Sequence, residues 1–323
     1  MSLKRIDAKD INYADSAARF ELKVGDTKGI GEARLYMGHN ESELDEFFDF
    51  ANIDCFFLLK EDLLRYLDDA QSEYLAPTRE YRSDITKLYN ENINNTKAIP
   101  EKTIKINFRK TYDAQKRYYI VLENGKENRA NYDLLRNICL PRFTIITFVK
   151  LEDTETRMRY VYFKPIFYID PSKKESQEQE KIENTLLTEN QKQKYRRRQT
   201  QYRLKLLESM PACLITQVTD DRLLVACHIK PYSECDNETE QYDTLNGIVF
   251  TPTYHTLFDL GFISFSKESK LIVSPFLSNL NKNRLGLIDG KSYRLQNGSE
   301  KYMKYHREHI LNVIKFNELD FVN

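Results

Sequence analysis

The feature that most constrains this chain of 323 residues is one short stretch, "TPTYHTLFDLG", that predicts a helix with two polar side chains on one face. Thr251 suits the N-cap, Pro252 the first helical position, and Gly261 the left-handed residue after the helix ends. His255 and Asp259 are four residues apart, so their imidazole and carboxylate lie one turn apart on the same face. Two such groups can share one divalent ion.

The residues before this helix place further polar groups at the ends of predicted strands. An apolar run, "RLLVACHI", ends in Cys227-His228, and the preceding run "ACLITQV" is expected to pair with it through the turn "TDD". Asn246-Gly247 opens a third apolar run, "GIVFT". A lone histidine is more often a core or surface residue than a ligand. The order of hairpin, loop, strand and helix, with polar residues at their ends, is more specific and indicates a site.

This order resembles the HNH nucleases, whose ββα-metal fold has the same succession of elements. The matching blocks are Cys213-Leu-Ile-Thr216, "CHIKPY", "NGIVFTPTYHTLFDLGFISF" and "YHREH", spread over roughly residues 195–311. The resemblance is to a restriction-endonuclease-like subgroup that carries its HNH domain at the C-terminal end. Tyr232 stands where Trp is commoner, which we interpret as a change in packing.

The resemblance implies a role for each polar residue of the site. His228 is expected to be the catalytic general base, and Asn246 to hold the backbone around that base or to reach the metal through water. His255 and Asp259 are expected to be metal ligands. Cys227 occupies a position that touches the metal in many relatives, and it is a further candidate ligand, although a thiol favours a softer ion than Mg²⁺. The expected cofactor is a divalent metal ion, with Mg²⁺ favoured and Mn²⁺ or another transition metal as the alternative.

These residue types suit phosphodiester hydrolysis independently of the resemblance. The reaction needs a base that is neutral near pH 7, and histidine is the side chain whose ordinary pKa meets this need. It also needs a cation beside the charge that develops on the phosphate, which one divalent ion on His255 and Asp259 can supply.

Positive charge is concentrated in two segments of a chain that is neutral as a whole. Residues 191–205 contain seven basic and no acidic side chains, and residues 101–150 contain 11 basic and 5 acidic ones with Tyr and Phe between them. The alternative for either segment is a solvated face. Because the first segment leads into the predicted nuclease module, we expect double-stranded DNA as the partner. The predicted DNA-binding residues are Arg196, Arg197, Arg198, Lys230 and Arg307.

The domain organisation is predicted from a change in composition near residue 171. Residues 1–171 combine strand-like and helix-like runs and are expected to form a mixed α/β DNA-recognition domain. Within it, "RFELKV" and "EARLYMG" are predicted to form a hairpin around "GDTKGIG", which lacks the third glycine of a dinucleotide site. Residues 172–195 are expected to be a charged linker or helix, and residues 196–323 the HNH nuclease domain. The fold class is α+β.

Other sequence features indicate the cellular compartment of the protein. No apolar run is long enough to span a membrane, and the N-terminus "MSLKRIDAKD" has no apolar leader, so no membrane partner is expected. The five cysteines include no Cys-x-x-Cys pair, which favours reduced thiols. We therefore expect a cytoplasmic protein.

The leading hypothesis is a metal-dependent DNA endonuclease, and within that class a Type II-like restriction enzyme that hydrolyses phosphodiester bonds of double-stranded DNA. Restriction symmetry is compatible with a homodimer, and a restriction-modification system would include a cognate DNA methyltransferase. The alternatives are a modification-dependent nuclease, a defence-effector nuclease, or a non-catalytic DNA-binding protein that uses the ββα unit as a scaffold. The intact set of His228, Asn246, His255 and Asp259 argues against the last of these.

Overall fold

The computed structural model describes residues 3–25, 33–168 and 188–314. The chain divides into two compact units, an N-terminal unit (Met1–Ile169 with Ile314–Asn323) and a C-terminal unit (Asp170–Val313). Each unit has its own buried apolar cluster among the described residues, so each is described by itself. No described helix combines the length and the apolar character that crossing a membrane requires.

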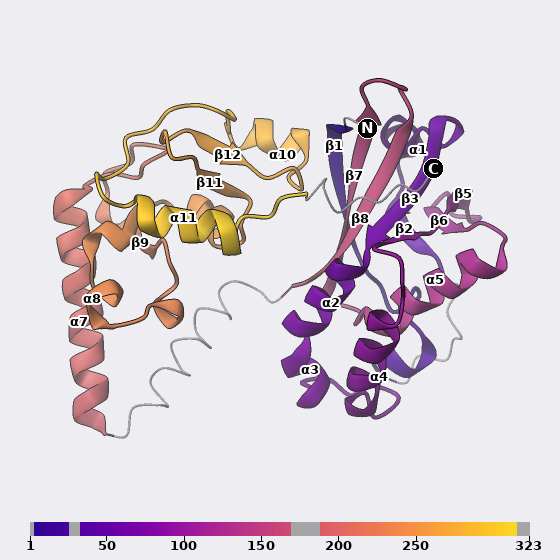
Figure 1. Cartoon of the computed structure of the whole chain (residues 1–323), viewed down its shortest axis with the longest axis horizontal. Helices are drawn as coiled ribbons and strands as arrows, with labels where there is room; N and C mark the ends of the chain where they lie inside the picture. The colour runs from indigo at the N-terminus through magenta and orange to yellow at the C-terminus, as the bar shows by residue number, and fades with distance from the viewer. Residues whose placement is uncertain (1–2, 26–32, 169–187, 315–323) are drawn as a thin grey trace. The chain divides into compact units, whose positions relative to one another are not determined.

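The N-terminal unit is built on a five-stranded mixed sheet (Figure 1). Its strands in sheet order are β1 (Leu3–Asn12), β7 (Thr144–Asp153), β8 (Arg159–Phe167), β3 (Ile53–Leu59) and β4 (Thr103–Lys105). Strands β8 and β3 run parallel, and all other neighbours are antiparallel. Most residues of β7 and β8 are buried, which is why their sequences are nearly continuous apolar runs without a clear alternation.

Helices and a smaller sheet complete this unit. The second sheet is antiparallel, in the order β2 (Leu35–Gly38), β6 (Tyr118–Leu122) and β5 (Phe108–Tyr112). The helices are α1 (Glu41–Phe48), α2 (Lys60–Asp69), α3 (Gln71–Leu75), α4 (Thr86–Lys97) and α5 (Lys126–Ile138). In the core of this unit, the Phe48 ring stacks on Phe56 with centroids 5.8 Å apart and meets Phe148 edge-on at 5.3 Å.

The predicted N-terminal hairpin is wrong. Residues Phe20–Leu22 form a 3₁₀ turn, and Val24 makes a single bridge to Tyr81. Strand β2 pairs instead with β6, more than 80 residues further along the chain, which a local pattern cannot indicate. The predicted loop with Gly29 and Gly31 lies outside the described residues.

The C-terminal unit begins its described part with a long helix, α7 (Glu189–Ser209), which therefore includes the described end of the predicted linker. Thr188 and Gln191 form a reciprocal capping box that fixes the start of α7. The remaining elements are β9 (Val225–His228), α8 (Glu238–Gln241), β10 (Gly247–Phe250), α9 (Pro252–Asp259), β11 (Ile263–Phe265), β12 (Leu271–Val273), α10 (Asn279–Arg284) and α11 (Glu300–His309).

The predicted strand "ACLITQV" is a turn. The backbone N–H of Cys213 donates to the Val218 carbonyl at 2.9 Å, and Gln217 has a positive φ of 60°. Only Leu214 reaches the sheet, by donating to the Val249 carbonyl at 2.9 Å. The run is apolar because its side chains are buried against the edge of β10. Apolar residues of a turn can be buried in the core as those of a strand are, so the pattern resembled a strand.

Candidate metal site and general base

Strands β9 and β10 pair antiparallel and β10 leads directly into α9, which gives the expected ββα unit, although the partner of β9 is β10 and not the run "ACLITQV". His228 lies opposite Gly247, and Cys227 opposite Ile248. Thr251 takes the N-cap position with Pro252 at the start of α9, but the Thr251 side chain makes no capping hydrogen bond. The predicted left-handed residue is confirmed at Gly261, with φ of 68°, where a Cβ would lie 2.1 Å from the Ile310 carbonyl oxygen.

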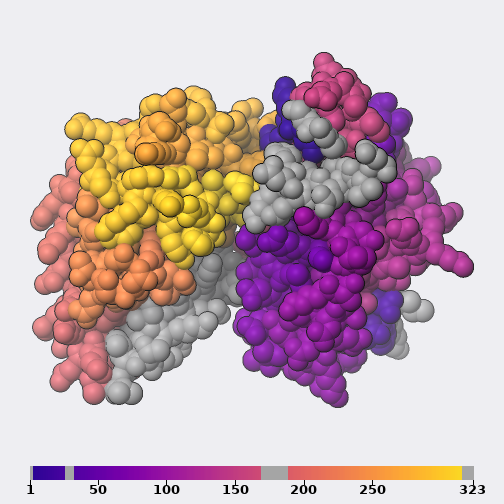
Figure 2. All heavy atoms as spheres, in the orientation of Figure 1, coloured from indigo at the N-terminus to yellow at the C-terminus, as the bar shows by residue number. Residues whose placement is uncertain are grey.

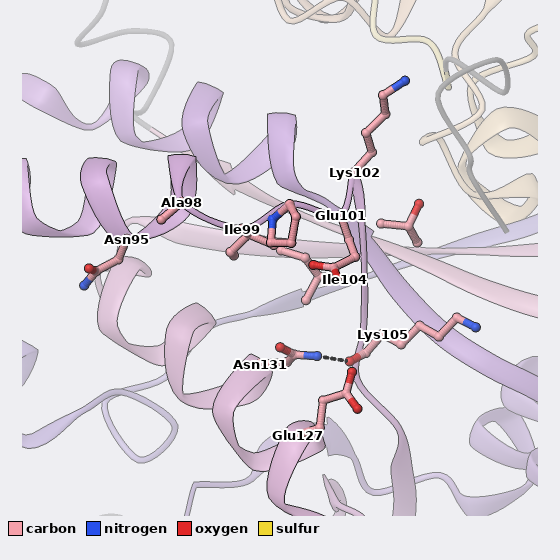
Figure 3. Close-up of a pocket in the computed structure, with 11 residues that line it drawn as sticks. Asn95, Ala98, Ile99, Glu101, Lys102, Ile104, Lys105, Glu127 and Asn131 are labelled. Atoms are coloured by element: carbon pink, nitrogen blue, oxygen red, sulfur yellow. Dashed lines mark hydrogen bonds between the residues drawn. The ribbon is translucent and has the colours of Figure 1, made fainter. Parts of the chain in front are cut away.

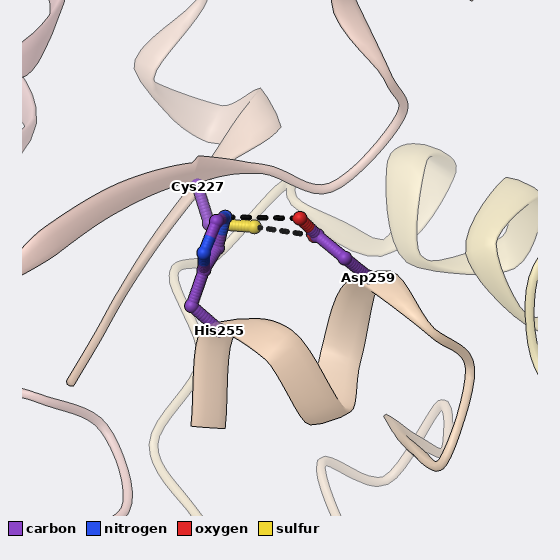
Figure 4. Close-up of side chains that lie close together, drawn as sticks. All are labelled: Cys227, His255 and Asp259. Atoms are coloured by element: carbon purple, nitrogen blue, oxygen red, sulfur yellow. Dashed lines mark hydrogen bonds and ion pairs between the residues drawn. The ribbon is translucent and has the colours of Figure 1, made fainter. Parts of the chain in front are cut away.

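The side chains of Cys227, His255 and Asp259 converge between β9 and α9 (Figure 4). Nε2 of His255 lies 3.0 Å from one carboxylate oxygen of Asp259, and the Cys227 thiol donates to the other at 3.3 Å. One donor atom from each residue lies within 4.8 Å of the other two. Cys227 is buried, His255 half-buried and Asp259 exposed, so the trio opens to solvent on the Asp259 side. This donor set fits one divalent ion.

The imidazole of His228 is held by contacts on its face and at one nitrogen. The Tyr202 ring of α7 stacks on it with ring centroids 4.4 Å apart and an interplanar angle of 10°. Nε2 of His228 lies 2.9 Å from the Gln241 carbonyl oxygen. Because a carbonyl only accepts, Nε2 carries the hydrogen, and the lone pair of the neutral ring is on Nδ1. The contacts thus select the tautomer and the ring orientation of His228.

Asn246 is completely buried and joins both ends of the loop that follows β9. Its side-chain oxygen accepts from the Lys230 N–H at 2.8 Å, and its amide donates to the Lys230 carbonyl at 3.1 Å and to the Glu240 carbonyl at 3.2 Å. Gln241, which supplies the carbonyl for His228, directly follows Glu240. Asn246 is thereby placed to fix the loop that orients His228.

Two of the predicted DNA-binding residues, Lys230 and Arg307, make ion pairs and hydrogen bonds within the protein. Lys230 forms ion pairs of 2.9 Å with both Asp236 and Glu240, and it is 9% exposed. Arg307 donates to the Phe265 carbonyl at 2.9 Å and pairs with Glu300 at 2.5 Å. The ion pairs and hydrogen bonds within the protein give both residues a role inside the domain. A DNA contact by Lys230 or Arg307 stays a prediction.

The other predicted contacts lie on α7, whose atoms are at the surface of the C-terminal unit (salmon in Figure 2). Arg196 and Arg197 are exposed, and Arg198 pairs with Glu238 at 2.7 Å while lying over the Tyr242 ring. Lys194 and Lys205 are also exposed. One face of the helix is buried through Tyr202 and Leu206. The exposed basic residues are spread over its other sides.

Tyr202 and Gln241 are the parts of the site that the sequence did not predict. Gln241 contributes through its backbone, for which no sequence signal exists. Tyr202 and Leu206 are four residues apart, which predicts a buried face of α7 but does not indicate what that face covers. Gly247 allows the close approach, because a Cβ there would lie 2.7 Å from both Tyr202 Oη and Leu206 Cδ1.

The basic segment 101–150 of the N-terminal unit is partly neutralised. Lys110 lies 2.9 Å from Glu41 and 2.7 Å from Asp45, and Arg117 pairs with Asp113 at 2.7 Å.

A cavity of about 720 Å³ in the N-terminal unit opens between α4, β4 and α5 (Figure 3). Lys102, Lys105, Glu101 and Glu127 are among its lining residues, so its charge is mixed. Nothing in this cavity assigns it a ligand.

Strands β9 and β10 and helix α9 form a ββα unit that brings a thiol, an imidazole and a carboxylate together as a candidate metal site. Residues 213–266 match the family model of the HNH endonucleases, and this match spans the turn at Cys213, both strands, α9 and β11. The C-terminal unit therefore contains an HNH endonuclease domain. A search of curated proteins found no match to the chain.

Proposed function

We propose that the protein is a metal-dependent endonuclease that hydrolyses phosphodiester bonds of double-stranded DNA. The observation that carries the proposal is the convergence of Cys227, His255 and Asp259, in the segment that matches the HNH endonucleases and also contains His228. A protein that used the ββα unit only as a scaffold would have no need of this donor set, nor of a histidine with a selected tautomer.

The chain's own residues supply the base and its support. Nδ1 of neutral His228 takes the proton from the water whose oxygen attacks phosphorus, while the bond between phosphorus and the leaving oxygen breaks. Tyr202 and Asn246 act as positioning residues, because one stacks on the ring and the other fixes the loop that accepts from Nε2. His255, Asp259 and Cys227 would hold a divalent ion, which would supply positive charge beside the phosphate.

DNA binding is proposed for exposed arginines of α7. Arg196 and Arg197 are exposed on the helix that also carries Tyr202, so a phosphate backbone bound by them would lie on the element that supports the base. Contacts of this kind position a duplex without reading its sequence. We therefore assign site choice to the N-terminal unit, in a Type II-like restriction enzyme that would be accompanied by a cognate methyltransferase.

The test is incubation of the full chain with supercoiled plasmid and a divalent ion, followed by sequencing of the product ends. Discrete fragments with a shared end sequence support a restriction enzyme. A smear supports a nuclease without site choice, and cleavage confined to modified plasmid supports a modification-dependent enzyme. Binding without cleavage in any divalent ion would contradict the nuclease proposal.

A further inference from the structure

We propose that the Cys227 thiolate is the third protein ligand of the metal, and that this site consequently prefers a thiophilic transition ion such as Zn²⁺ to Mg²⁺. The inference rests on the proposed function for the presence of an ion, and it goes beyond it by naming the ion's class and the residue that selects it. It also reverses the preference for Mg²⁺ that the resemblance alone suggested.

The distances between the donor atoms suit a small tetrahedral centre. Bonds of about 2.0–2.3 Å to sulfur, nitrogen and oxygen place neighbouring ligand atoms about 3.4–3.5 Å apart at tetrahedral angles. The Cys227 sulfur lies 3.3 Å from Asp259, and the His255 nitrogen 3.0 Å from the same carboxylate. The third spacing, between Cys227 and His255, is at most 4.8 Å, so side-chain adjustment would let all three bind one ion.

The chemistry of the donor set separates the candidate ions. Mg²⁺ requires octahedral oxygen ligands and retains several waters, so a sulfur and a nitrogen among three protein ligands suit it poorly. Three protein ligands with sulfur and nitrogen donors, plus one open position for water or substrate, are typical of catalytic zinc. Without an ion, the Cys227 thiol donates its hydrogen to Asp259. When an ion binds, the sulfur would lose this proton to solvent and would bind the metal as a thiolate.

The burial of Cys227 indicates that its thiol is held in position before a metal ion binds. Cys227 is 2% exposed and lies in the apolar cluster of the C-terminal unit, while β9 holds its backbone through the pairing with Ile248. A buried, strand-borne ligand has little conformational freedom to lose on binding. The exposed Asp259 leaves the approach to the trio open from solvent.

The experiment is Co²⁺ binding to the intact protein, followed by absorption spectroscopy and calorimetry. Coordination by a thiolate gives an intense charge-transfer band in the near ultraviolet, which oxygen and nitrogen ligands do not give. We expect this band in the wild type and in Cys235→Ser, the matched control for a half-buried thiol outside the trio, and we expect its loss in Cys227→Ser. We also expect Cys227→Ser to weaken Zn²⁺ binding by on the order of 100-fold or more.

A second variant tests ion choice. Cys227→Asp replaces sulfur by oxygen and is expected to lose the band, weaken Zn²⁺ binding and strengthen Mg²⁺ binding. Bound Co²⁺ without the band in the wild type, or a band that survives in Cys227→Ser, would overturn the inference. Cleavage of DNA with Mg²⁺ by a protein that shows no band would leave the nuclease standing and remove only the thiolate, whereas the band without any cleavage would uphold the ligand and remove the nuclease.

Discussion

Two histidines of the C-terminal unit show how the environment decides the role of one residue type. His306 is 1% exposed, stacks on Phe258 with ring centroids 3.7 Å apart, and is held at Nε2 by the Phe258 carbonyl and at Nδ1 by the Ser264 hydroxyl. His228 is half-buried and has one nitrogen committed to a carbonyl. The helical spacing of His306 and His309 does not separate a core histidine from a surface one, so the structure was needed to assign His306 to the core.

Burial lowers the pKa of His306 to about 4, against smaller raising effects of the Phe258 carbonyl and of Asp259. The unfolded chain binds a proton near pH 6.5, whereas the folded chain does not until about pH 4, so stability rises from pH 4 to 6.5. The loss on acidification through this window is about 3 kcal/mol from His306 alone.

Urea unfolding at pH 7 and pH 5 measures this contribution. We expect His306→Leu to flatten the dependence on pH, and His309→Ala, an exposed control on the same helix, to leave it unchanged. An equal dependence on pH in the wild type and in His306→Leu would show that the acid loss arises elsewhere.

His228→Ala is expected to reduce cleavage by on the order of 10²–10⁴-fold and to leave DNA binding nearly intact, because a general base acts in the transition state. Single-turnover rates at saturating metal measure cleavage, and a gel-shift titration measures DNA binding. Both are compared between the wild type, His228→Ala and the control His309→Ala. A wild-type rate in His228→Ala would remove this residue from the reaction.

At the scale of elements, the sequence predicted the helices and strands whose formation depends on residues close together in the chain. Helix α9 was predicted because Pro252 and the spacing of His255 and Asp259 lie within it and Gly261 follows its end. The strand-like segment 103–112 divides between β4 and β5 in different sheets, because strand partners lie far along the chain. His255 and Asp259 were paired by their spacing within α9, whereas Cys227 was added as a candidate ligand by the resemblance to the HNH nucleases.

The support that α7 gives to the base could not be predicted, because it depends on packing between segments that a sequence pattern does not pair. Tyr202 donates from its hydroxyl to the Asn246 carbonyl at 3.1 Å in addition to stacking on His228. The two contacts can be separated by substitution, since phenylalanine keeps the ring and loses only the hydroxyl.

We expect Tyr202→Leu to lower the single-turnover cleavage rate by about tenfold, which corresponds to about 1.4 kcal/mol, and to shift the dependence of the rate on pH. Tyr202→Phe should retain most of the rate because it preserves the stack. Unfolding midpoints for both variants separate positioning from a loss of stability. Equal rates and pH profiles in Tyr202→Leu and the wild type would leave Tyr202 with a structural role only.

At the scale of the whole molecule, the two units are expected to divide the work. Each has its own buried core, and the capping box at Thr188 gives the C-terminal unit a defined start. A fragment of residues 188–323 should therefore fold and cleave weakly without site preference. A fragment of residues 1–171 should prefer the cleavage site of the full chain over random duplex, by the ~10³-fold or more that specific binding usually shows.

A competition gel shift with the two fragments at physiological salt compares these preferences. If residues 1–171 bind all duplexes alike while residues 188–323 keep the preference, the HNH endonuclease domain chooses the site and the assigned roles are reversed.

The most direct test of the account is conversion of supercoiled plasmid by the full chain in the presence of Zn²⁺, Mn²⁺ or Mg²⁺ and in EDTA. It is run beside a variant that carries both His228→Ala and Asp259→Ala. We predict nicked or linear product only with a divalent ion and only from the wild type. Product that forms equally in EDTA, or equally from the double variant, would show that the base and metal trio of the C-terminal unit do not carry out the cleavage.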